Sequence, residues 1–590
     1  MFMNKQESDI LIELSLNRET NQRKIAEKTG HSLGIVNRSL CALKKEGFLD
    51  EELHCTKKAS QEFRKSAPKN AIILAAGFGM RMVPINMEVP KAFLEVRGEL
   101  LIERLIRQLN EAGIFDITIV VGFMKEQFDY LIDEYGVQLV VNPLYASRNN
   151  LHSLDLVADQ IHNSYILPCD IWMQENPFRN KELYSWYSVS SKPDEFSDVR
   201  VNRKMELVRR NSKESGNQMV GIAYLTGGKA ETVRKNLRKY SENSLYDEAF
   251  WEEALYEKDR MIVEAKVFHE DDAIMIDTFE QLREIDGDSN HLKSDAIETA
   301  AKALGVFPEE IRDITVLKKG MTNRSFLFRC DQKRYIMRIP GEGTSKLINR
   351  KEEAEVYSIV KEAGICDPIV LIDPDSGYKI TEYIENSRVC DPNDPEDVKK
   401  CMTKLREFHS LKLKTGHRFD LFEMAAFYES LRGKSPSMYR DYERTKEKVM
   451  SLKARIESFK KEECLTHIDA VPDNFLFYAD ETGEEKIALI DWEYSGMQDP
   501  DVDIAMFAIY ALYDKKQVDA LINAYYESGC PEETRTKIYC YIAVCGFLWS
   551  NWCEYKKTLG IEFGEYSLKQ YRYAKDFYRY AEERKEETSK

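Results

Sequence analysis

His467-Ile-Asp469-Ala-Val-Pro-Asp-Asn474, followed by Ile490-Asp491-Trp-Glu493, decides the fold of the C-terminal half of this chain. Phosphoryl transfer needs a carboxylate against the attacking hydroxyl, an amide oxygen on Mg²⁺ and a second carboxylate on Mg²⁺. Asp469, Asn474 and Asp491 supply these groups in that order. A purely structural role for the same polar residues is the alternative. Because both halves of the pattern occur together and in order, the sequence predicts a phosphotransferase.

Length and composition indicate a multidomain globular protein. The chain has 590 residues, 43% hydrophobic and 32% charged, and a formal net charge of −16. Roughly 150 residues per domain predicts three or four domains, and the negative charge argues against nonspecific attraction to nucleic acid or anionic membrane. No apolar run reaches about 18 residues, so no membrane span is expected, and the N-terminus lacks the apolar core of a signal peptide. Twelve cysteines without a Cys-x-x-Cys pair argue against structural zinc and a disulfide framework. We therefore expect a reduced, cytoplasmic enzyme.

The first seventy residues differ in charge from the rest, with 13 Lys/Arg against 10 Asp/Glu. Apolar residues at helical spacing predict three helices, over residues 8–16, 21–28 and 32–46. The turn between the last two contains Gly30 and ends at Ser32, a good N-cap. Residues 48–58 are expected to form a small wing.

Residues 1–66 resemble the winged helix-turn-helix domains of bacterial regulators. The resemblance implies DNA contact by Asn37, Arg38 and Lys44. The alternative is a small helical module used for packing, dimerisation or regulation, so DNA and a second copy of the chain are both candidate partners. A strongly salt-dependent DNA affinity would decide for DNA.

A glycine-containing loop follows a buried strand in the middle of the chain. After a linker at residues 66–70 and a strand at 71–76 comes Gly77-Phe-Gly79-Met-Arg81, and further on Pro90-Lys91. The loop is not a P-loop, because the Gly-Lys-Ser/Thr ending is absent, and it is not the dinucleotide fingerprint, because a third glycine is missing.

The whole run from Leu74 to Lys91 resembles the nucleotidyltransferase family that activates sugar phosphates and phosphocholine. The resemblance implies a Rossmann-like α/β domain over residues 70–288, with Asn86 as a departure where relatives often carry Thr. Glycines let backbone N–H groups close around a triphosphate, while Arg81 and Lys91 neutralise the phosphates and the pyrophosphate leaving group. The residues expected to bind CTP through this loop are Ala75, Ala76, Gly77 and Gly79.

Two carboxylates are expected to hold Mg²⁺ in this domain. In the family, an Asp at the end of a strand binds the metal and a second Asp arrives near the close of the domain. The corresponding residues here are Asp170 and Asp277. Converging carboxylates suit a hard, oxygen-preferring ion, although a strand-end cap is the alternative for Asp170 taken alone.

Two segments, 149–153 and 176–180, look most like those of the CTP:phosphocholine cytidylyltransferases. Phosphocholine carries a quaternary ammonium group, which aromatic faces and a nearby carboxylate hold best. Phe196, Trp251 and Glu252 are the candidate residues for this task. For Trp251 the alternative is a place in the core.

The C-terminal half also contains elements expected of an ATP site. The His-x-Asp-x4-Asn spacing is typical of a kinase catalytic loop, and the turn 317–324, which contains Gly320, would cover ATP phosphates. Arg338 takes the place of the strand lysine of protein kinases. Glu353 is its expected partner, with Glu355 as the competitor and a surface ion pair as the alternative. Glu382 and Tyr383 are expected at the hinge that receives adenine.

Residues 291–590 resemble the choline/aminoglycoside kinase superfamily, in particular the choline kinases of bacterial surface decoration. The resemblance is carried by Gly320-Met-Thr-Asn-Arg, Arg338-Ile-Pro-Gly-Glu-Gly343-Thr and residues 405–410, and it implies a two-lobed, protein-kinase-like fold. By resemblance Asp469 deprotonates the choline hydroxyl, Asn474 and Asp491 hold Mg²⁺, and Asp503 holds the catalytic loop.

The C-terminal tail is rich in aromatic residues. Such density on helices more often serves core packing than ligand binding. Trp549 and Trp552, however, share a helix face at i and i+3, and choline is a ligand that such a face suits. These two residues, with Tyr510 behind them, are candidates for a choline cage.

These features together predict a multidomain α/β and α+β protein with an ATP site and a CTP site. Choline and ATP would give phosphocholine, which with CTP would give CDP-choline, with Mg²⁺ in both sites. The destination expected by analogy is phosphocholine decoration of a bacterial surface glycan or lipid. The alternatives are a kinase for ethanolamine or another amino alcohol, a nucleotidyltransferase for another phosphomonoester or phosphonate, and a DNA-binding regulator that senses metabolites.

Overall fold

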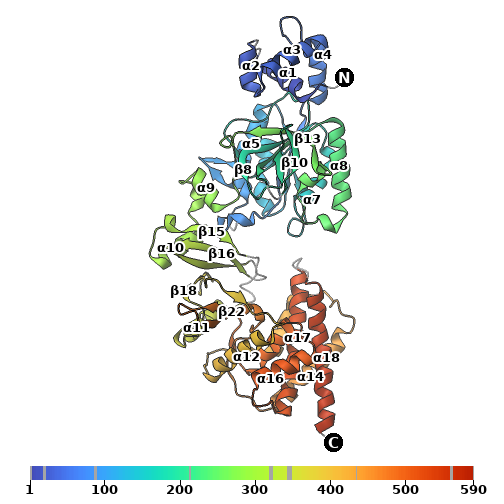
Figure 1. Ribbon diagram of the computed structural model, residues 1–590. Helices are drawn as coiled ribbons and strands as arrows, with labels where there is room; N and C mark the ends of the chain where they lie inside the picture. Colours follow the sequence, from blue (N-terminus) through green and yellow to red (C-terminus); the bar gives the residue numbers. More distant parts are fainter. Residues whose placement is uncertain are drawn as a thin grey trace. The chain divides into compact units, whose positions relative to one another are not determined.

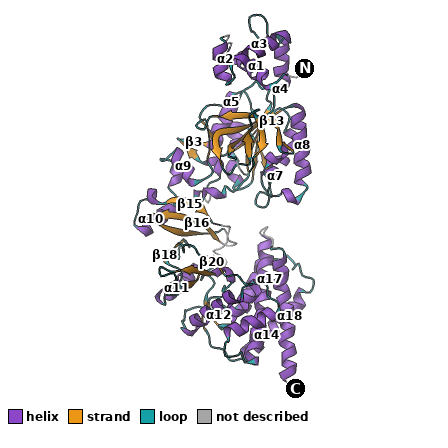
Figure 2. Cartoon of the chain, viewed as in Figure 1, coloured by secondary structure: helices purple, strands orange, loops and turns teal. Residues whose placement is uncertain are grey.

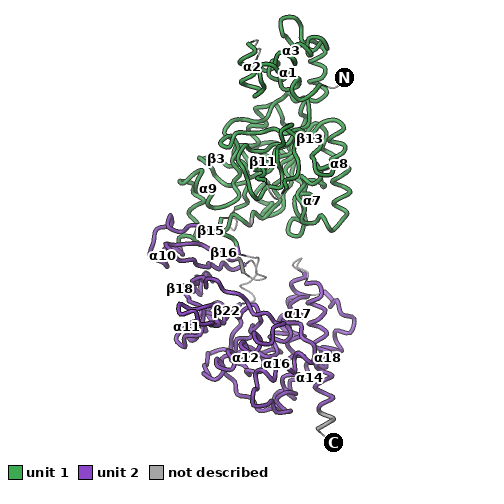
Figure 3. The backbone as a smooth tube through the Cα atoms, viewed as in Figure 1, with its two compact units in different colours: residues 1–298, 314–316 green, residues 299–313, 317–590 purple. Residues whose placement is uncertain are grey.

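The structure, a computed structural model, describes residues 3–17, 21–85, 89–211, 214–317, 323–341, 348–433, 435–558 and 563–588. It divides into two compact units, residues 1–298 with 314–316 and residues 299–313 with 317–590 (Figure 3). Asn86, Gly320 and Gly343, which the sequence analysis singled out, lie outside the described residues. Within the described part of the chain, no helix is long and apolar enough to cross a membrane.

The helices α1 to α4 open the first unit, as Figure 1 shows. The three predicted helices are confirmed, and Ser32 caps the third by accepting a hydrogen bond from the Ile35 N–H. Gly30 ends the second helix at φ 69°, a left-handed conformation that favours glycine. A fourth helix was missed by the sequence analysis. The bounds are α1 Lys5–Asn17, α2 Gln22–Thr29, α3 Leu33–Lys45 and α4 Lys57–Ser66.

In place of the wing predicted over residues 48–58, the structure has one isolated antiparallel bridge between Leu49 and Cys55, and residues 57 and 58 begin α4. The segment after α4, predicted to be a linker, is held by hydrogen bonds. Asn163 Nδ2 donates to the carbonyls of Lys65 and Ala67 at 2.8 and 3.1 Å. The helical module is therefore attached to the sheet domain that follows it.

That domain is built on a ten-stranded sheet of order β5-β4-β1-β6-β11-β8-β13-β10-β9, with β12 paired to β13. The strands β5, β4, β1 and β6 run parallel, with Asn70 of β1 opposite Asp116 of β4 and Ser164 of β6. Helices flank the sheet (Figure 2), and apolar side chains from both faces form separate buried clusters. The carboxyl ends of parallel strands meet at one edge, where α/β proteins bind ligands.

The bounds of the sheet are β1 Asn70–Ala75, β4 Asp116–Val121, β5 Gln138–Val141, β6 Ser164–Pro168, β8 Trp186–Asp194, β9 Val199–Val201, β10 Glu206–Arg209, β11 Gly216–Leu225, β12 Tyr256–Glu257 and β13 Arg260–Phe268. A separate pair joins β7 Ile171–Met173 to β14 Ala273–Met275. The main helices are α5 Leu101–Glu111, α6 Tyr130–Tyr135, α7 Asn150–Asp155, α8 Gly227–Ser241 and α9 Phe279–Ile285.

The second unit combines a five-stranded sheet with a larger helical part. The sheet has the order β15-β16-β17-β19-β18. The last three residues of β15 and the first turn of α10 are assigned to the first unit. The helical part is centred on α17, which packs along α18. The strands are β15 Arg312–Val316, β16 Asn323–Cys330, β17 Lys333–Pro340, β18 Ile369–Ile372, β19 Lys379–Glu382, β20 Arg388–Val389, β21 Cys464–Thr466, β22 Phe475–Ala479, β23 Glu485–Leu489 and β24 Gly496–Gln498. The helices are α10 Asp295–Leu304, α11 Arg350–Glu362, α12 Pro395–Ser410, α13 Leu421–Leu431, α14 Tyr442–Ser458, α15 Asp501–Tyr510, α16 Lys515–Tyr525, α17 Glu532–Thr558 and α18 Glu565–Thr588.

Candidate active sites

In the first unit, the loop after β1 forms one wall of a cavity of about 1000 Å³. Ala75 and Ala76 are buried at the strand end, and Gly77 and Gly79 line the cavity. Gly79 adopts φ +60°, and a Cβ there would come within 2.6 Å of Lys91 Cγ. Glycine at this position therefore lets the loop approach Lys91 closely.

Lys91 lies between the two predicted metal-binding carboxylates. Its Nζ is 3.0 Å from Asp170 Oδ2 and 2.6 Å from Asp277 Oδ1, and Arg81 is 3.2 Å from Asp277. Asp170 follows β6 and Asp277 follows β14, so two separate strand ends bring the carboxylates together. Burial disfavours the charged amine, but the two carboxylates outweigh burial and raise the pKa of Lys91. Burial opposes ionisation of Asp277, yet Lys91 and Arg81 lower its pKa.

The other end of this cavity contains Glu252 and Trp251. The Tyr187 hydroxyl donates to Glu252 Oε1 at 3.0 Å, while Glu252 Oε2 is buried without a hydrogen-bond partner. Burial raises the pKa of Glu252 to about 7. Trp251 lines the cavity but is only 2% exposed and belongs to the core.

Phe196 also lines the cavity, but its side chain is 93% exposed. The three predicted phosphocholine-binding residues therefore share one cavity without forming a closed cage. Sequence reasoning missed Tyr187, because only its position beside Glu252 in space distinguishes it from the other buried aromatic residues of the domain.

In the second unit, the catalytic-loop residues occupy a connection between β21 and β22. Asn474 Nδ2 donates to the Asp469 carbonyl at 2.8 Å and to its carboxylate at 3.1 Å. The Asp503 carboxylate accepts hydrogen bonds from the backbone N–H groups of His467 and Ile468, at 2.9 and 2.7 Å. Asp503 thus holds the loop in the manner expected from the resemblance.

Asp491 follows β23 and lines the same cavity of about 350 Å³ as Asp469 and Asn474. Its φ is +67°, a left-handed conformation that non-glycine residues adopt uncommonly. Burial, together with the carboxylates of Asp491 and Glu493, raises the pKa of Asp469 to about 8. Asp469 is therefore a stronger base than an ordinary aspartate.

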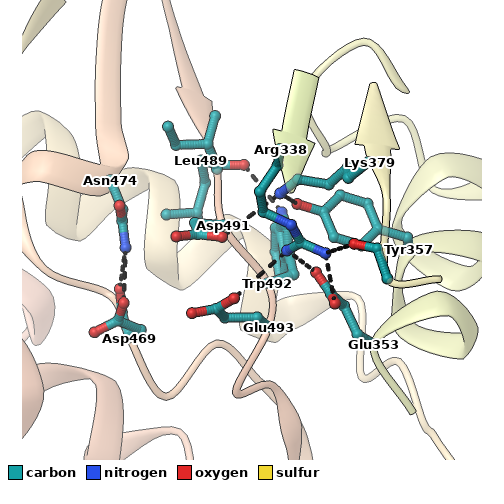
Figure 4. A network of polar contacts seen from close by, with 12 residues as sticks. Arg338, Glu353, Tyr357, Lys379, Asp469, Asn474, Leu489, Asp491, Trp492 and Glu493 are labelled. Carbon is teal, nitrogen blue, oxygen red and sulfur yellow. Dashed lines mark hydrogen bonds and ion pairs between the residues drawn. The ribbon is translucent and has the colours of Figure 1, made fainter. Parts of the chain in front are cut away.

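Arg338 and Glu353 form a buried, bidentate ion pair (Figure 4). The side chains are 5% and 0% exposed, so this pair is not on the surface. Although burial opposes ionisation, Arg338 lowers the pKa of Glu353 to about 2. The competitor Glu355 instead accepts hydrogen bonds from Thr415 Oγ1 and Gly416 N, each at 2.8 Å.

The two predicted hinge residues, Glu382 and Tyr383, come directly after a residue that lines the cavity. Thr381 lines the cavity, whereas the Glu382 carboxylate pairs with Lys333 at 2.9 Å and the Tyr383 ring lies under the Arg334 guanidinium. The Glu382 N–H already donates to the Pro368 carbonyl at 2.8 Å. The side chains of Glu382 and Tyr383 are thus engaged away from the cavity.

Aromatic residues cover the side of this cavity beside Asp469. Trp549 and Trp552 meet edge to face at 5.4 Å between ring centroids, and the Tyr510 hydroxyl donates to Asp473 at 2.7 Å. Sequence reasoning did not select two further members of this wall. Among the described residues, the aromatic side chains that line the cavity are Tyr494, Tyr510, Trp549, Trp552 and Tyr566. Tyr494, three residues after Asp491, could have been found from its proximity in sequence.

Comparisons with known proteins follow the same division. The choline/ethanolamine kinase family matches residues 314–546, and the MobA-like NTP transferase domain family matches residues 71–180. The choline-phosphate cytidylyltransferase of Streptococcus pneumoniae is 37% identical over 186 residues, which cover 31% of this chain and 81% of that protein.

The kinase half has relatives of its own. Protein LicA of Haemophilus influenzae is 29% identical over 262 residues, covering 42% of this chain and 95% of that protein. The crystal structure of choline kinase LicA from Streptococcus pneumoniae has 30% identity and a TM-score of 0.42, and covers 48% of this chain and 96% of that chain. These homologues support a bifunctional choline kinase and cytidylyltransferase. The chain belongs to the choline-phosphate cytidylyltransferase family and carries a choline/ethanolamine kinase domain in the same polypeptide.

Proposed function

We propose that this chain converts choline into CDP-choline in two successive reactions, with phosphocholine as the intermediate. The observation that carries the proposal is the presence of two complete sets of groups in one chain. One set combines Asp469 with an aromatic wall, and the other combines Lys91 and its carboxylates with the buried Glu252. The product of the first set is the substrate of the second.

In the kinase reaction, the aromatic wall holds the trimethylammonium group and directs the hydroxyl toward Asp469. Asp469 accepts the hydroxyl proton while the oxygen attacks the γ-phosphorus of ATP, and ADP leaves. The raised pKa of Asp469 suits this role, because a stronger base takes the proton more readily. Asn474 keeps the Asp469 carboxylate oriented by its hydrogen bond.

In the cytidylyl transfer, a phosphate oxygen of phosphocholine attacks the α-phosphorus of CTP, and pyrophosphate leaves. The glycine loop presents backbone N–H groups to the triphosphate, while Lys91 and Arg81 balance the charge on the leaving pyrophosphate. Glu252, as its carboxylate, pairs with the quaternary ammonium group. Trp251 and Phe196 offer aromatic faces to the same group.

The donor sets in both sites fit Mg²⁺. Asp170 and Asp277 would hold it in the cytidylyltransferase site, and Asn474 and Asp491 in the kinase site. Within the described residues no group of three or more His, Cys, Asp or Glu could hold a metal, and Mg²⁺ ordinarily binds through one or two carboxylates plus water and substrate phosphates. When bound, the ion neutralises phosphate charge.

The test is ³¹P NMR of the purified chain with choline, Mg²⁺, ATP and CTP. A phosphomonoester signal that gives way to a diphosphate signal of CDP-choline supports both reactions in this order. Accumulation of phosphocholine with CTP untouched refutes the second reaction. Ethanolamine in place of choline, and UTP in place of CTP, tests the substrate assignment in each half.

For the N-terminal module we propose a DNA-binding helix-turn-helix as a second candidate function. It is supported by the capped α2–α3 pair joined at Gly30, with Asn37 and Arg38 exposed on α3. Lys44 is less available, because its Nζ donates to the Glu51 carbonyl at 2.7 Å. Fluorescence anisotropy with duplex DNA at rising salt tests this, and no salt-dependent binding refutes it.

We further propose a reducing, cytoplasmic location. All twelve cysteines are free, as is usual where thiols stay reduced. Mass spectrometry of thiols alkylated in intact cells tests this, and disulfide-linked peptides would contradict it.

A further inference from the structure

Lys379 is a second cation in the kinase cavity, and the sequence analysis did not select it. It lies on β19 directly opposite Arg338 of β17 in the antiparallel register. Directly opposed residues of antiparallel strands point to the same face of the sheet. Both side chains line the cavity that contains Asp469 and Asp491 (Figure 4). Two cations are therefore available where protein kinases use one for the ATP phosphates.

Arg338 is already committed to protein acceptors. Its terminal nitrogens donate to both oxygens of Glu353, to the Gly377 carbonyl at 3.2 Å and to Glu493 at 3.4 Å. Four of its five N–H donors are thus occupied. A phosphate that took one of these four donors would have to displace a protein acceptor, and the fifth donor, Nε–H, is buried without a partner. The arrangement instead suits an arginine that fixes α11, which carries Glu353, against β17.

Lys379 is differently placed. Its ammonium group donates to the Tyr357 hydroxyl at 2.7 Å and lies 3.5 Å from Asp491 Oδ1. An ammonium has three N–H donors, so one remains for a ligand. Tyr357 is itself buried on α11 and thereby restrains the lysine. Lys379 is thus a cation held beside a predicted metal ligand with donor capacity to spare.

The negative charge of the cavity also favours a cation at this position. Asp367, Asp469 and Asp491 all line this cavity, so a triphosphate entering it would face several carboxylates. The restrained ammonium charge of Lys379 next to Asp491 offsets that repulsion better than a guanidinium already neutralised by two glutamates.

We propose that Lys379 binds the phosphates of ATP, and that Arg338 is a positioning residue that holds Glu353 and α11. This inference rests on the proposed kinase function. In protein kinases the lysine that contacts the ATP phosphates lies on the strand that corresponds to β17. Here the contact is assigned to Lys379 on β19 instead. The role of Asp469 is unchanged.

The test compares the affinities of the full chain for ATP and for adenosine by calorimetry. In K379M we expect ATP to bind about 10- to 100-fold more weakly, because one charge-assisted hydrogen bond is lost. The affinity for adenosine should be unchanged. The kcat/KM for ATP should fall in parallel while the KM for choline stays constant. Cytidylyl transfer by the same variant reports on the folding of the rest of the chain.

Two further variants separate phosphate binding from structure. R338K keeps the buried charge but loses the bidentate geometry, so we expect a lower melting temperature with the ATP-to-adenosine affinity ratio unchanged. Y357F removes the restraint on Lys379 and should lower that ratio by less than K379M does. The proposal is overturned if K379M keeps the ratio of the unmodified chain, or if R338K alone loses it. An unmodified chain that binds ATP but does not phosphorylate choline refutes the proposed reaction and leaves the Lys379 result interpretable.

Discussion

The two candidate active sites use the same residue types in opposite ways. In the cytidylyltransferase site one lysine, Lys91, joins two aspartates, and the pKa of Asp277 is lowered. In the kinase site Asp469 has no ion-pair partner within the described part of the chain, and its pKa is raised to about 8. Both carboxylates are largely buried, so the difference comes from their neighbours.

This difference matches the tasks we propose. A carboxylate that holds a metal ion must stay ionised, and a nearby cation keeps it so. A carboxylate that accepts a proton must be basic, and burial beside other carboxylates makes it so.

The largest effect is expected for Asp469→Asn. The amide cannot accept the hydroxyl proton, so choline phosphorylation should fall about 1000-fold. Cytidylyl transfer from added phosphocholine should be unchanged, and this activity is the control for folding. A variant that keeps a tenth or more of the kinase rate would show that Asp469 is not the base.

A smaller loss is expected for Lys91→Met. Without the amine, Asp170 and Asp277 repel each other and the pyrophosphate loses a counter-charge, so cytidylyl transfer should fall about 100-fold. Choline phosphorylation should be unaffected. The matched control is Lys125→Ala, which removes an exposed lysine of the same domain. Equal losses in the two variants would contradict a specific role for Lys91.

The aromatic wall tests substrate recognition in the kinase half. Trp552→Leu should raise the KM for choline about tenfold, since a cation–π contact is worth about 0.5 to 1 kcal/mol at an exposed site and about 2 kcal/mol or more when desolvated. The KM for ATP should not change. Phe547→Leu serves as the control, because Phe547 is buried on the same helix but packs against Tyr442 outside the cavity. If both variants alter the KM for choline equally, the aromatic residues serve core packing and do not bind choline.

An effect of the same size is expected for pH and Glu252. Its pKa in the folded chain is raised from 4.5 to about 7, and only the carboxylate form attracts the quaternary ammonium group. Phosphocholine affinity should therefore rise about tenfold from about pH 6 to about pH 8, and Glu252→Gln should abolish this dependence. Titration calorimetry at several pH values measures it.

The stability of the folded chain should change with pH in the direction opposite to phosphocholine affinity. Because the folded chain holds the Glu252 proton more tightly than the unfolded chain, the free energy of unfolding falls as pH rises from 4.5 to about 7. The full penalty, about 3 kcal/mol, applies above that range. Glu252→Gln should thus be more stable than the unmodified chain at high pH. Thermal unfolding of the nucleotidyltransferase domain measures this difference. If the stability difference between Glu252→Gln and the unmodified chain is the same at high and at low pH, the raised pKa of Glu252 is contradicted.

Several elements could be predicted from the sequence because they depend on neighbours along the chain. The helices of the N-terminal module follow from apolar spacing, Ser32 and Gly30. The catalytic loop follows from the spacing between Asp469 and Asn474, which sets their hydrogen bond. Helix α4 was missed, because its residues 57–66 are mostly polar and only Ala59 and Phe63 are buried.

The chemistry of each half can be predicted from residue types and spacing alone, because these show which residues can neutralise phosphates, accept a proton or face a quaternary ammonium. The contacts between these groups, and the donors and acceptors that each group has left for a ligand, depend on the folded chain. The register of β17 and β19 places Lys379 beside Arg338, and the packing around Glu252 leaves one of its oxygens without a partner. The physical reason is that strand register, burial and charge pairing are long-range properties, which residues distant in sequence acquire only when the chain folds.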